Sequence, residues 1–237
     1  MTAKFWAVIP AAGVGTRMGS EVPKQYLSLR GRTVLEHTVE RFQTHPRIEG
    51  VVVAVAVRDT LWDKLPCAHM DKVRRAEGGA ERCHSVLNAL ALLAEFAADD
   101  DWVLVHDAAR PCLRAADIDR MLDTLARHRF GGILAVPVRD TIKRGDADGT
   151  ITATIDRSGL WHAQTPQMFR LADLRGALER VLAAGRIVTD EAQAIELDGG
   201  QPVLVEGHVD NIKITQPQDM KLAELFLRQQ EEERTCA

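Results

Sequence analysis

Short runs of Val, Ile and Leu alternate along this chain with longer segments in which apolar residues recur at helical spacing. Such alternation is typical of βαβ units, because parallel strands need a connecting segment long enough for a helix. It predicts an α/β fold with a mostly parallel, doubly wound sheet. The predicted strands are 5–9, 51–57, 102–105, 133–136 and 203–205, and the predicted helices are 34–42, 85–96, 118–126, 171–182 and 220–226.

Length and composition agree with one such unit. The 237 residues are enough to bury a full core, and 46% hydrophobic with 27% charged residues is ordinary for a globular protein. We therefore expect one domain over residues 1–237. The net charge of -4 provides no general attraction to nucleic acid or to an anionic membrane. Any phosphate group must then be bound by locally placed cations.

The chain shows no sign of secretion or of covalent cross-linking. No stretch is apolar enough to span a membrane, and the first residues lack the pattern of a signal peptide, so we expect a cytoplasmic protein without a membrane partner. The four cysteines have no C-x-x-C spacing, which indicates neither a zinc site nor a disulfide framework.

Residues 139–158 interrupt the alternation. TIKR at 141–144 precedes a turn cluster, GDADG at 145–149, and TITATI follows at 150–155. This pattern predicts a projecting β-hairpin that no helix covers. Because an isolated two-stranded ribbon is marginal in water and leaves open edges, we expect the arm to pack on a second subunit of a homodimer. The alternative is a ribbon folded back on its own domain.

A glycine-rich loop, PAAGVGTRMG at 10–19, leaves the carboxyl end of the first predicted strand. Its small residues let backbone N–H groups approach phosphate oxygens. Met18 stands where a dinucleotide loop has its last glycine, and no Gly-Lys-Ser/Thr follows. Instead, Arg17 and Lys24 could flank a triphosphate and stabilise charge on a leaving pyrophosphate. A tight turn with two solvated cations is the alternative.

Further motifs follow in order along almost the whole chain. They are PKQY at 23–26, GGAERCHSV at 78–86, VHDAARP at 105–111, DR at 156–157, TPQ at 165–167, TDEA at 189–192 and NIKIT at 211–215. With the glycine-rich loop, they make the chain resemble nucleotidyltransferases of the sugar-nucleotide pyrophosphorylase type, and more narrowly the 2-C-methyl-D-erythritol 4-phosphate cytidylyltransferases. The joint pattern is highly specific.

The resemblance implies a fold and a reaction. The fold would be Rossmann-like, of the nucleotidyltransferase type. The enzyme would join CTP and 2-C-methyl-D-erythritol 4-phosphate (methylerythritol phosphate) into 4-(cytidine 5'-diphospho)-2-C-methyl-D-erythritol, with release of pyrophosphate, in non-mevalonate isoprenoid biosynthesis. The acceptor phosphate would attack the α-phosphorus in line. Because that phosphate is already ionised, no general base is needed, and we expect His106 to be a packing residue.

The resemblance also assigns residues to each substrate. For CTP these are Pro10, Ala11, Ala12, Gly13, Gly15, Gly79, Arg82 and Ser85. For the acceptor they are Asp107, Ala108, Arg110, Thr141, Thr165 and Thr189. Gly78 and Gly79 would allow close approach to a planar base, and Ser85 would offer a hydroxyl. Capping of a helix is the alternative for Ser85, and a helix start is the favoured interpretation of Asp190 and Glu191.

Four cations are expected to be catalytic. Arg17 and Lys24 would act on the triphosphate, while Arg157 and Lys213 would orient the incoming phosphate. The arm would carry Arg157 to the site of the neighbouring subunit.

Mg²⁺ or another divalent cation would bridge the nucleotide phosphates, with Asp107 as the candidate protein ligand, or otherwise through substrate phosphates alone. Asp107 could equally be a structural partner of Arg110.

Two other functions remain open. A ribitol 5-phosphate cytidylyltransferase shares the loop and much of the scaffold. A non-catalytic nucleotide-binding module could use the same fold, although it would not need all four cations.

Overall fold

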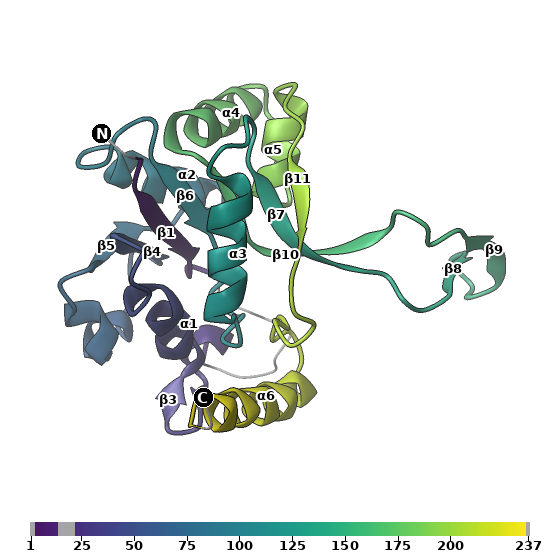
Figure 1. The fold of residues 1–237 in the computed structure, drawn as a ribbon, viewed down its shortest axis with the longest axis horizontal. Coiled ribbons are helices and arrows are strands. Elements are labelled where there is room, and N and C mark those ends of the chain that lie inside the picture. The colour runs from purple at the N-terminus through teal and green to yellow at the C-terminus, as the bar shows by residue number, and fades with distance from the viewer. Residues whose placement is uncertain (1–2, 14–21, 236–237) are drawn as a thin grey trace.

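The computed structural model describes residues 3–13 and 22–235, and a seven-stranded sheet forms the centre of this part of the chain (Figure 1). Its strand order is β11-β7-β10-β6-β1-β4-β5. Only β10 runs antiparallel to its neighbours, so the prediction of a mostly parallel sheet is confirmed. The strands are β1 (Phe5–Pro10), β4 (Gly50–Val55), β5 (Val73–Glu77), β6 (Trp102–Val105), β7 (Gly132–Pro137), β10 (Trp161–Arg170) and β11 (Val203–Glu206).

The sequence predicted five of these strands and missed β5 and β10. β5 lies at an edge of the sheet and buries only Val73 and Ala76, so it lacks a continuous apolar run. β10 contains Pro166 and several polar residues, which argue against a central strand when they are judged locally. In the structure its register with β7 shifts between Ala163 and Gln167, on either side of that proline.

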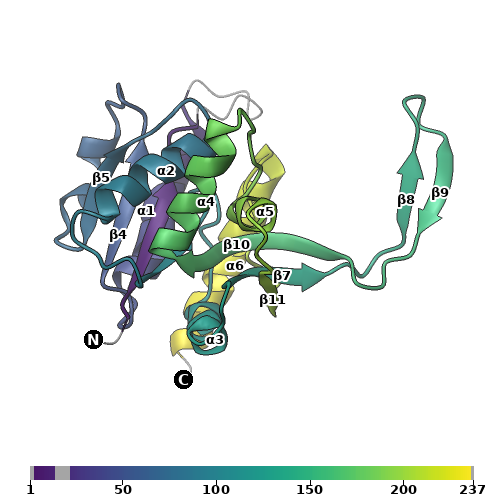
Figure 2. The same ribbon diagram turned by 90° about the horizontal axis from the view of Figure 1, so that it is seen from above.

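Helices cover both faces of the sheet, as Figures 1 and 2 show. Successive residues of β1 point to opposite faces: Ile9 packs with α1 and α3, whereas Val8 packs with α2, α4 and α5. This is the doubly wound arrangement that the alternation predicted. The helices are α1 (Val34–Gln43), α2 (Arg82–Leu93), α3 (Ala115–Leu125), α4 (Leu171–Ala183), α5 (Glu191–Leu197) and α6 (Pro217–Thr235).

Local signals define two helix starts. Thr33 caps α1 in a reciprocal arrangement, in which its hydroxyl accepts the N–H of Glu36 and Glu36 accepts the N–H of Thr33. Asp190 caps α5 by accepting the N–H of Gln193 at 3.0 Å. The expected helix start at Asp190 is therefore confirmed, although the sequence analysis did not propose the rest of α5.

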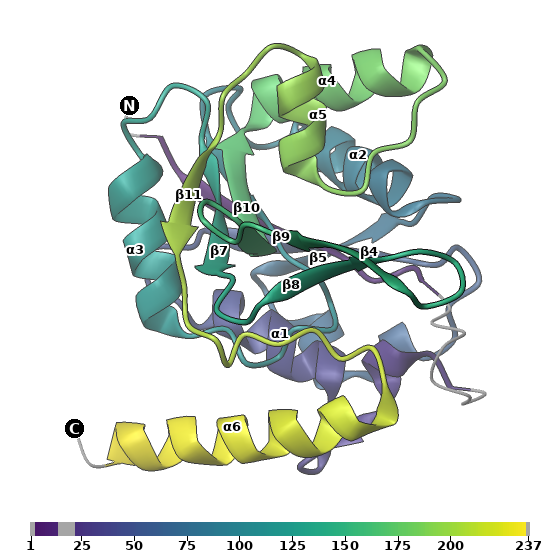
Figure 3. The same cartoon turned by 90° about the vertical axis from the view of Figure 1, so that its right-hand side faces the viewer.

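Helix α6 is longer than predicted, because the polar residues after Phe226 continue it to Thr235. It lies along α1 (Figure 3). Leu29 of β2 (Ser28–Leu29) and Arg30, in the turn before β3 (Arg32–Thr33), also contact α6. Ala223 and Leu227 of α6 pack with Leu29, Val34 and Ile214.

The predicted hairpin forms and projects from the body of the molecule, as Figure 2 shows. Strands β8 (Ile142–Gly145) and β9 (Ile151–Ile155) pair antiparallel, with Ile142 opposite Ile155. No other strand of the described residues joins this two-stranded sheet. The side chain of Ile151 is 63% exposed. The ribbon therefore leaves both edges open in this chain.

In the ranges that the structure describes, no helix has both the length and the apolar character needed to cross a membrane.

Candidate active site

A cleft of about 290 Å³ opens where β1, β5 and β6 end. The chain passes from β1 to β4 on one side and later returns to β6 on the other, so this is the switch point at which doubly wound sheets bind ligands. The lining residues are Pro10, Ala11, Ala12, Gly13, Lys24, Gln25, Gly79, Ala80, Glu81, Arg82, Ser85, Asp107, Ala108, Ala109 and Lys213.

The cleft gathers most of the predicted site. Every described residue assigned to CTP lines it, together with Lys24, Lys213, Asp107 and Ala108. Gly15 and Arg17 lie outside the described residues. Arg110 and Thr165 contact Asp107 but do not line the cleft. Thr189, Thr141 and Arg157 are also absent from the lining.

Gln25 holds the start of the glycine-rich loop, at Ala11 and Gly13. Its Nε2 donates to the carbonyl oxygens of Ala11 at 2.7 Å and Gly13 at 3.0 Å, and the side chain is only 4% exposed. In a trans peptide the carbonyl and the next N–H point in opposite directions, so Gln25 turns the N–H of Ala12 away from itself. Gln25 is part of the PKQY motif, from which no role for it was predicted. Its place beside Lys24 was the available signal.

Lys24 joins the first motif to the last. Its Nζ donates to the carbonyl of Ile214 at 3.1 Å, and the N–H of Ile214 donates to the carbonyl of Ala109. Segments that lie 190 residues apart in the chain thereby form one wall of the cleft.

Two glycines directly after β5 let the chain pass close to Ala12 and His84. A Cβ on Gly78 would lie 2.2 Å from the Cβ of Ala12, and one on Gly79 would lie 2.3 Å from the Cβ of His84. The protein's own chain therefore requires both glycines.

Ser85 is not the cap of α2. Glu81 occupies that position, and Ser85 is the fourth residue of the helix. The Ser85 hydroxyl accepts the N–H of Gly79 at 3.0 Å and donates to the carbonyl of Glu81. The capping alternative for Ser85 is wrong, and its hydroxyl instead orders the loop that lines the cleft.

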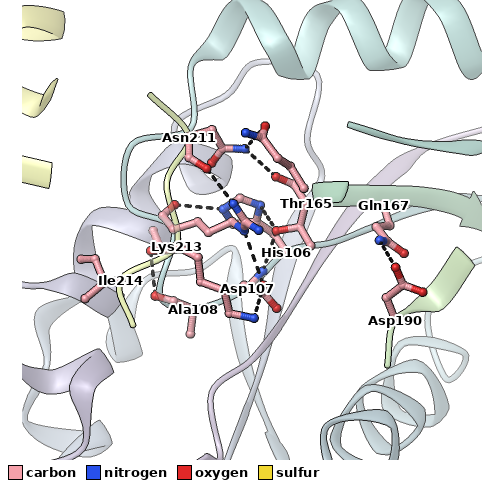
Figure 4. A network of polar contacts seen from close by, with 12 residues as sticks. His106, Asp107, Ala108, Thr165, Gln167, Asp190, Asn211, Lys213 and Ile214 are labelled. Carbon is pink, nitrogen blue, oxygen red and sulfur yellow. Dashed lines mark hydrogen bonds and ion pairs between the residues drawn. The ribbon is translucent and has the colours of Figure 1, made fainter. Parts of the chain in front are cut away.

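Asp107 lies among three cations near the centre of the site, part of which is drawn in Figure 4. Its Oδ1 accepts from Arg82 Nε at 3.0 Å, and its Oδ2 lies 2.9 Å from Lys213 Nζ and 3.5 Å from Arg110 Nε. Burial alone would raise the pKa of Asp107, but Arg82, Lys213 and Arg110 outweigh it and hold this pKa well below its usual range. Asp107 is therefore ionised throughout the neutral range.

Arg82 connects Asp107 to Glu191, the first residue of α5. The guanidinium and the Glu191 carboxylate form a bidentate pair with bonds of 2.6 and 3.0 Å, and Glu191 is 1% exposed. Burial alone would lower the pKa of Arg82, but the two carboxylates raise it above its ordinary value. The sequence analysis took Glu191 for a residue suited to a helix start and missed this buried pair.

Thr165 and His106 form a hydrogen-bonded chain that fixes the backbone of Asp107 (Figure 4). The Thr165 hydroxyl accepts the N–H of Asp107 at 3.0 Å and lies 3.0 Å from His106 Nδ1. His106 Nε2 lies 3.0 Å from the carbonyl of Arg110. One tautomer satisfies all of these contacts: Nε2–H donates to Arg110, and Nδ1 accepts from Thr165.

Burial lowers the pKa of His106 from 6.5 to about 4, so the ring is neutral at neutral pH. Both ring nitrogens are engaged within the protein, and the side chain is fully buried. This arrangement fits the expected packing role of His106 and not that of a general base.

Arg110 and Asn211 connect this cluster to the segment that carries Lys213. Arg110 donates to the carbonyl of Asn211 at 2.7 Å, and Asn211 Nδ2 donates to the carbonyl of Thr165 at 2.7 Å. The structure therefore brings together residues of three motifs that are distant in sequence.

Three residues assigned to the acceptor side do not reach the cleft of their own chain. Thr189 is exposed, and both its N–H and its hydroxyl contact the side chain of Gln193. Thr141 and Arg157 are exposed on the ribbon, where Arg157 donates to the carbonyl of Arg139.

Asp107 does not fit the role of metal ligand in this structure, because cations engage both of its oxygens. The described part of the chain also contains no group of three His, Cys, Asp or Glu residues that could hold a metal ion.

Known proteins match this chain over the region that contains these motifs. The family model for 2-C-methyl-D-erythritol 4-phosphate cytidylyltransferase matches residues 5–229. Proteins of that name from Pseudomonas putida (strain W619) and Pseudomonas syringae pv. tomato are 57% and 54% identical. These matches cover 92% and 97% of this chain, and 93% and 96% of the relatives.

Solved structures of proteins from this family have a similar fold. A crystal structure of 4-diphosphocytidyl-2C-methyl-D-erythritol synthase is similar with a TM-score of 0.84 and 43% identity, over 96% of this chain and 99% of the other. The 2-C-methyl-D-erythritol 4-phosphate cytidylyltransferase from Thermus thermophilus has a TM-score of 0.77 and 32% identity, over 94% and 98%.

Proposed function

Because this chain belongs to the 2-C-methyl-D-erythritol 4-phosphate cytidylyltransferase family, we propose that it joins CTP to methylerythritol phosphate and releases pyrophosphate. The product is 4-diphosphocytidyl-2C-methyl-D-erythritol, an intermediate of non-mevalonate isoprenoid biosynthesis. The observation that carries this conclusion is the family match over 5–229, within which the motifs of the cleft all fall.

We propose that CTP occupies the side of the cleft formed after β1 and β5. Ala11, Ala12 and Gly13 would lie beside its phosphates, and the N–H of Ala12 would face them, because Gln25 holds the carbonyl of Ala11 on the other side. The N–H of Ala11 itself donates to the carbonyl of Ala54. The base and ribose would lie near Gly79 and Ser85, whose hydrogen bond orders the second loop. Arg17 and Lys24 would stabilise the departing pyrophosphate.

The acceptor would lie on the Asp107 side. Lys213 is 40% exposed and contacts Asp107, so its ammonium can receive the acceptor phosphate from solvent. A phosphate oxygen of the acceptor would attack the α-phosphorus in line. The new O–P bond forms as the bond to the β-phosphate breaks, and the electron pair leaves with pyrophosphate. No proton need be removed from the nucleophile.

We further propose that Mg²⁺, or another divalent cation, binds through the phosphate oxygens of CTP. The three cations around Asp107 support this over direct coordination by that carboxylate. When bound, the metal ion would neutralise phosphate charge.

We also propose a homodimer in which the β8–β9 ribbon reaches the partner. Arg157 and Thr141 lie on this ribbon, outside the cleft of their own chain, and the exposed Ile151 needs a surface to cover it. A two-fold pair would cover both ribbons and could complete each site with an Arg157 from the other chain. A cytoplasmic location stays a prediction.

A pyrophosphate-release assay tests the reaction directly. With CTP and Mg²⁺, we expect rapid release with methylerythritol phosphate and little with ribitol 5-phosphate. Faster turnover of ribitol 5-phosphate would favour the rival cytidylyltransferase. Binding of CTP without release from either acceptor would favour a non-catalytic module.

A further inference from the structure

A second cavity, of about 520 Å³, lies beside α1, α6 and the turn between β2 and β3. No described residue lines both this cavity and the catalytic cleft. The lining is strongly polar and comes from three elements that are distant in sequence. It consists of Arg30, Arg32, His37, Glu40, Arg41, Glu224, Leu227, Gln230, Glu231 and Arg234. We call it the arginine cavity.

Two of its four arginines are neutralised by acids. Arg30 pairs with Glu231 at 2.7 Å, and Arg32 pairs with Glu40 at 2.8 Å. For Arg41 and Arg234, no acidic group of the described residues lies within salt-bridge distance. Glu224 is the only other acid among the described lining residues, so the cavity keeps an excess of positive charge.

His37 does not add to this charge at neutral pH. Its Nε2 lies 2.8 Å from the carbonyl of Leu29, and burial lowers its pKa below 6.5. The excess charge therefore belongs to Arg41 and Arg234.

Arg41 has hydrogen-bonding capacity to spare. Its Nε donates to the carbonyl of Pro111 at 2.9 Å. Within the described ranges, nothing accepts a hydrogen bond from its two terminal nitrogens. Burial, and next the positive charge of Arg234, lower the pKa of Arg41. The two guanidinium groups thus act on each other electrostatically, and an anion between them would relieve this repulsion.

We propose that the arginine cavity binds a phosphate group, either as free orthophosphate or as part of a phosphate ester, between Arg41 and Arg234. Guanidinium groups suit this ligand, because their planar fork of N–H donors matches phosphate oxygens in pairs. At about 520 Å³ the cavity has room for the organic part of an ester as well.

Calorimetry can test the site on a Lys213→Ala background, which removes the cation proposed to receive the acceptor phosphate, while the nucleotide side of the catalytic cleft is filled. The protein would be saturated with Mg²⁺ and a CTP analogue that carries a methylene group between the α- and β-phosphates, which prevents transfer. Orthophosphate and glycerol 3-phosphate would then be titrated separately at constant ionic strength set with chloride. We expect one binding event per chain, and the ligand that binds more tightly identifies the source of the phosphate group.

Variants locate this event. Arg234→Gln should weaken binding about tenfold, since a charge-assisted hydrogen bond is lost. Arg234 is exposed in the last turn of α6, so folding should be preserved. The matched control is Arg228→Gln, on the same helix but outside the lining, and its affinity should equal that of the unmodified protein. Arg41→Gln should also weaken binding of the phosphate ligand. Thermal unfolding of this variant would show whether it is folded.

Crystals grown with arsenate in place of phosphate would show where the anion lies. An anomalous peak between Arg41 and Arg234 is expected. Three results would each overturn the proposal: no binding beyond that of chloride, affinity unchanged in both arginine variants, or arsenate found only in the catalytic cleft.

Discussion

Gln25 holds Ala11 and Gly13 in place through two hydrogen bonds, and its Nε2 atom donates both of them. Replacing it by Met, which is similar in size, leaves the carbonyls of Ala11 and Gly13 without a donor. We expect kcat/KM for CTP to fall about 10- to 100-fold, because two net hydrogen bonds to residues 11–13 are lost. The KM for methylerythritol phosphate should change much less.

Steady-state kinetics with each substrate varied in turn would measure this split. Gln218→Met is the matched control, because Gln218 is exposed at the start of α6 and should leave both constants unchanged. Equal damage to both substrates by Gln25→Met, or a loss of thermal stability alone, would show that Gln25 does not position the nucleotide.

His106 makes stability depend on pH. Its pKa is lowered from 6.5 to about 4 in the folded protein, so the unfolded chain binds the proton more readily. The stability that the neutral ring contributes is complete above pH 6.5 and is lost as pH falls towards 4. Between pH 8 and pH 5 the loss should be about 2 kcal/mol.

Urea unfolding of the unmodified protein and of His106→Gln at pH 8 and pH 5 would isolate this contribution. Between pH 8 and pH 5 the free energy of unfolding of the variant should fall by about 2 kcal/mol less than that of the unmodified protein, since Gln does not titrate. His69→Gln, at an exposed histidine, should behave like the unmodified protein. Identical pH dependence of the His106 variant and the unmodified protein would contradict the assignment of a buried neutral ring.

At the scale of elements, the Arg82–Glu191 pair fastens α5 to α2, while Arg82 also reaches the loop after β6. Arg82→Ala leaves the buried Glu191 carboxylate without its cation and should be strongly destabilised, whereas Glu191→Ala leaves Arg82 paired with Asp107 and should cost less. A double-mutant cycle with Arg82→Ala and Glu191→Ala should therefore give a coupling free energy of about 2 kcal/mol or more.

The cycle would be measured by urea unfolding. Arg180 and Asp198 form a bidentate comparison pair at the surface, through Nε and one terminal nitrogen, and their coupling should be much smaller because solvent screens it. Additive effects of the two buried substitutions would mean that the ion pair does not hold the helices together.

At the scale of the whole molecule, the proposed homodimer rests on the open ribbon and on Thr141 and Arg157, which lie outside the cleft of their own chain. If Arg157 acts in the partner's cleft, mixing Arg157→Ala chains with Lys24→Ala chains should restore activity. Random reassociation makes half of the dimers mixed, each with one intact site, so about a quarter of the normal activity is expected.

Mass spectrometry would confirm that mixed dimers have formed before their activity is measured. Mixed dimers as inactive as either parent would show that the sites are not shared. Sedimentation of a fully active monomer would remove the dimer from the mechanism.

Much of the fold follows from local patterns. The runs that form β1, β4 and β6 are apolar throughout, because strands in the middle of a parallel sheet are buried on both faces. The same reasoning failed for β5 and β10. Their pairing depends on neighbours that occupy the sheet first, and neither the charged edge of β5 nor Pro166 in β10 signals a strand locally.

The sequence by itself determined the kind of chemistry, because the loop after β1 and the ordered motifs place small residues and cations where strands end. Only the tertiary structure decided which groups meet. Glu191 lies 109 residues from Arg82, and Asn211 lies 101 residues from Arg110, so no local pattern indicates either contact. It also decided that the ribbon projects from the body and that its residues do not line the cleft of their own chain, since exposure depends on how the whole chain packs.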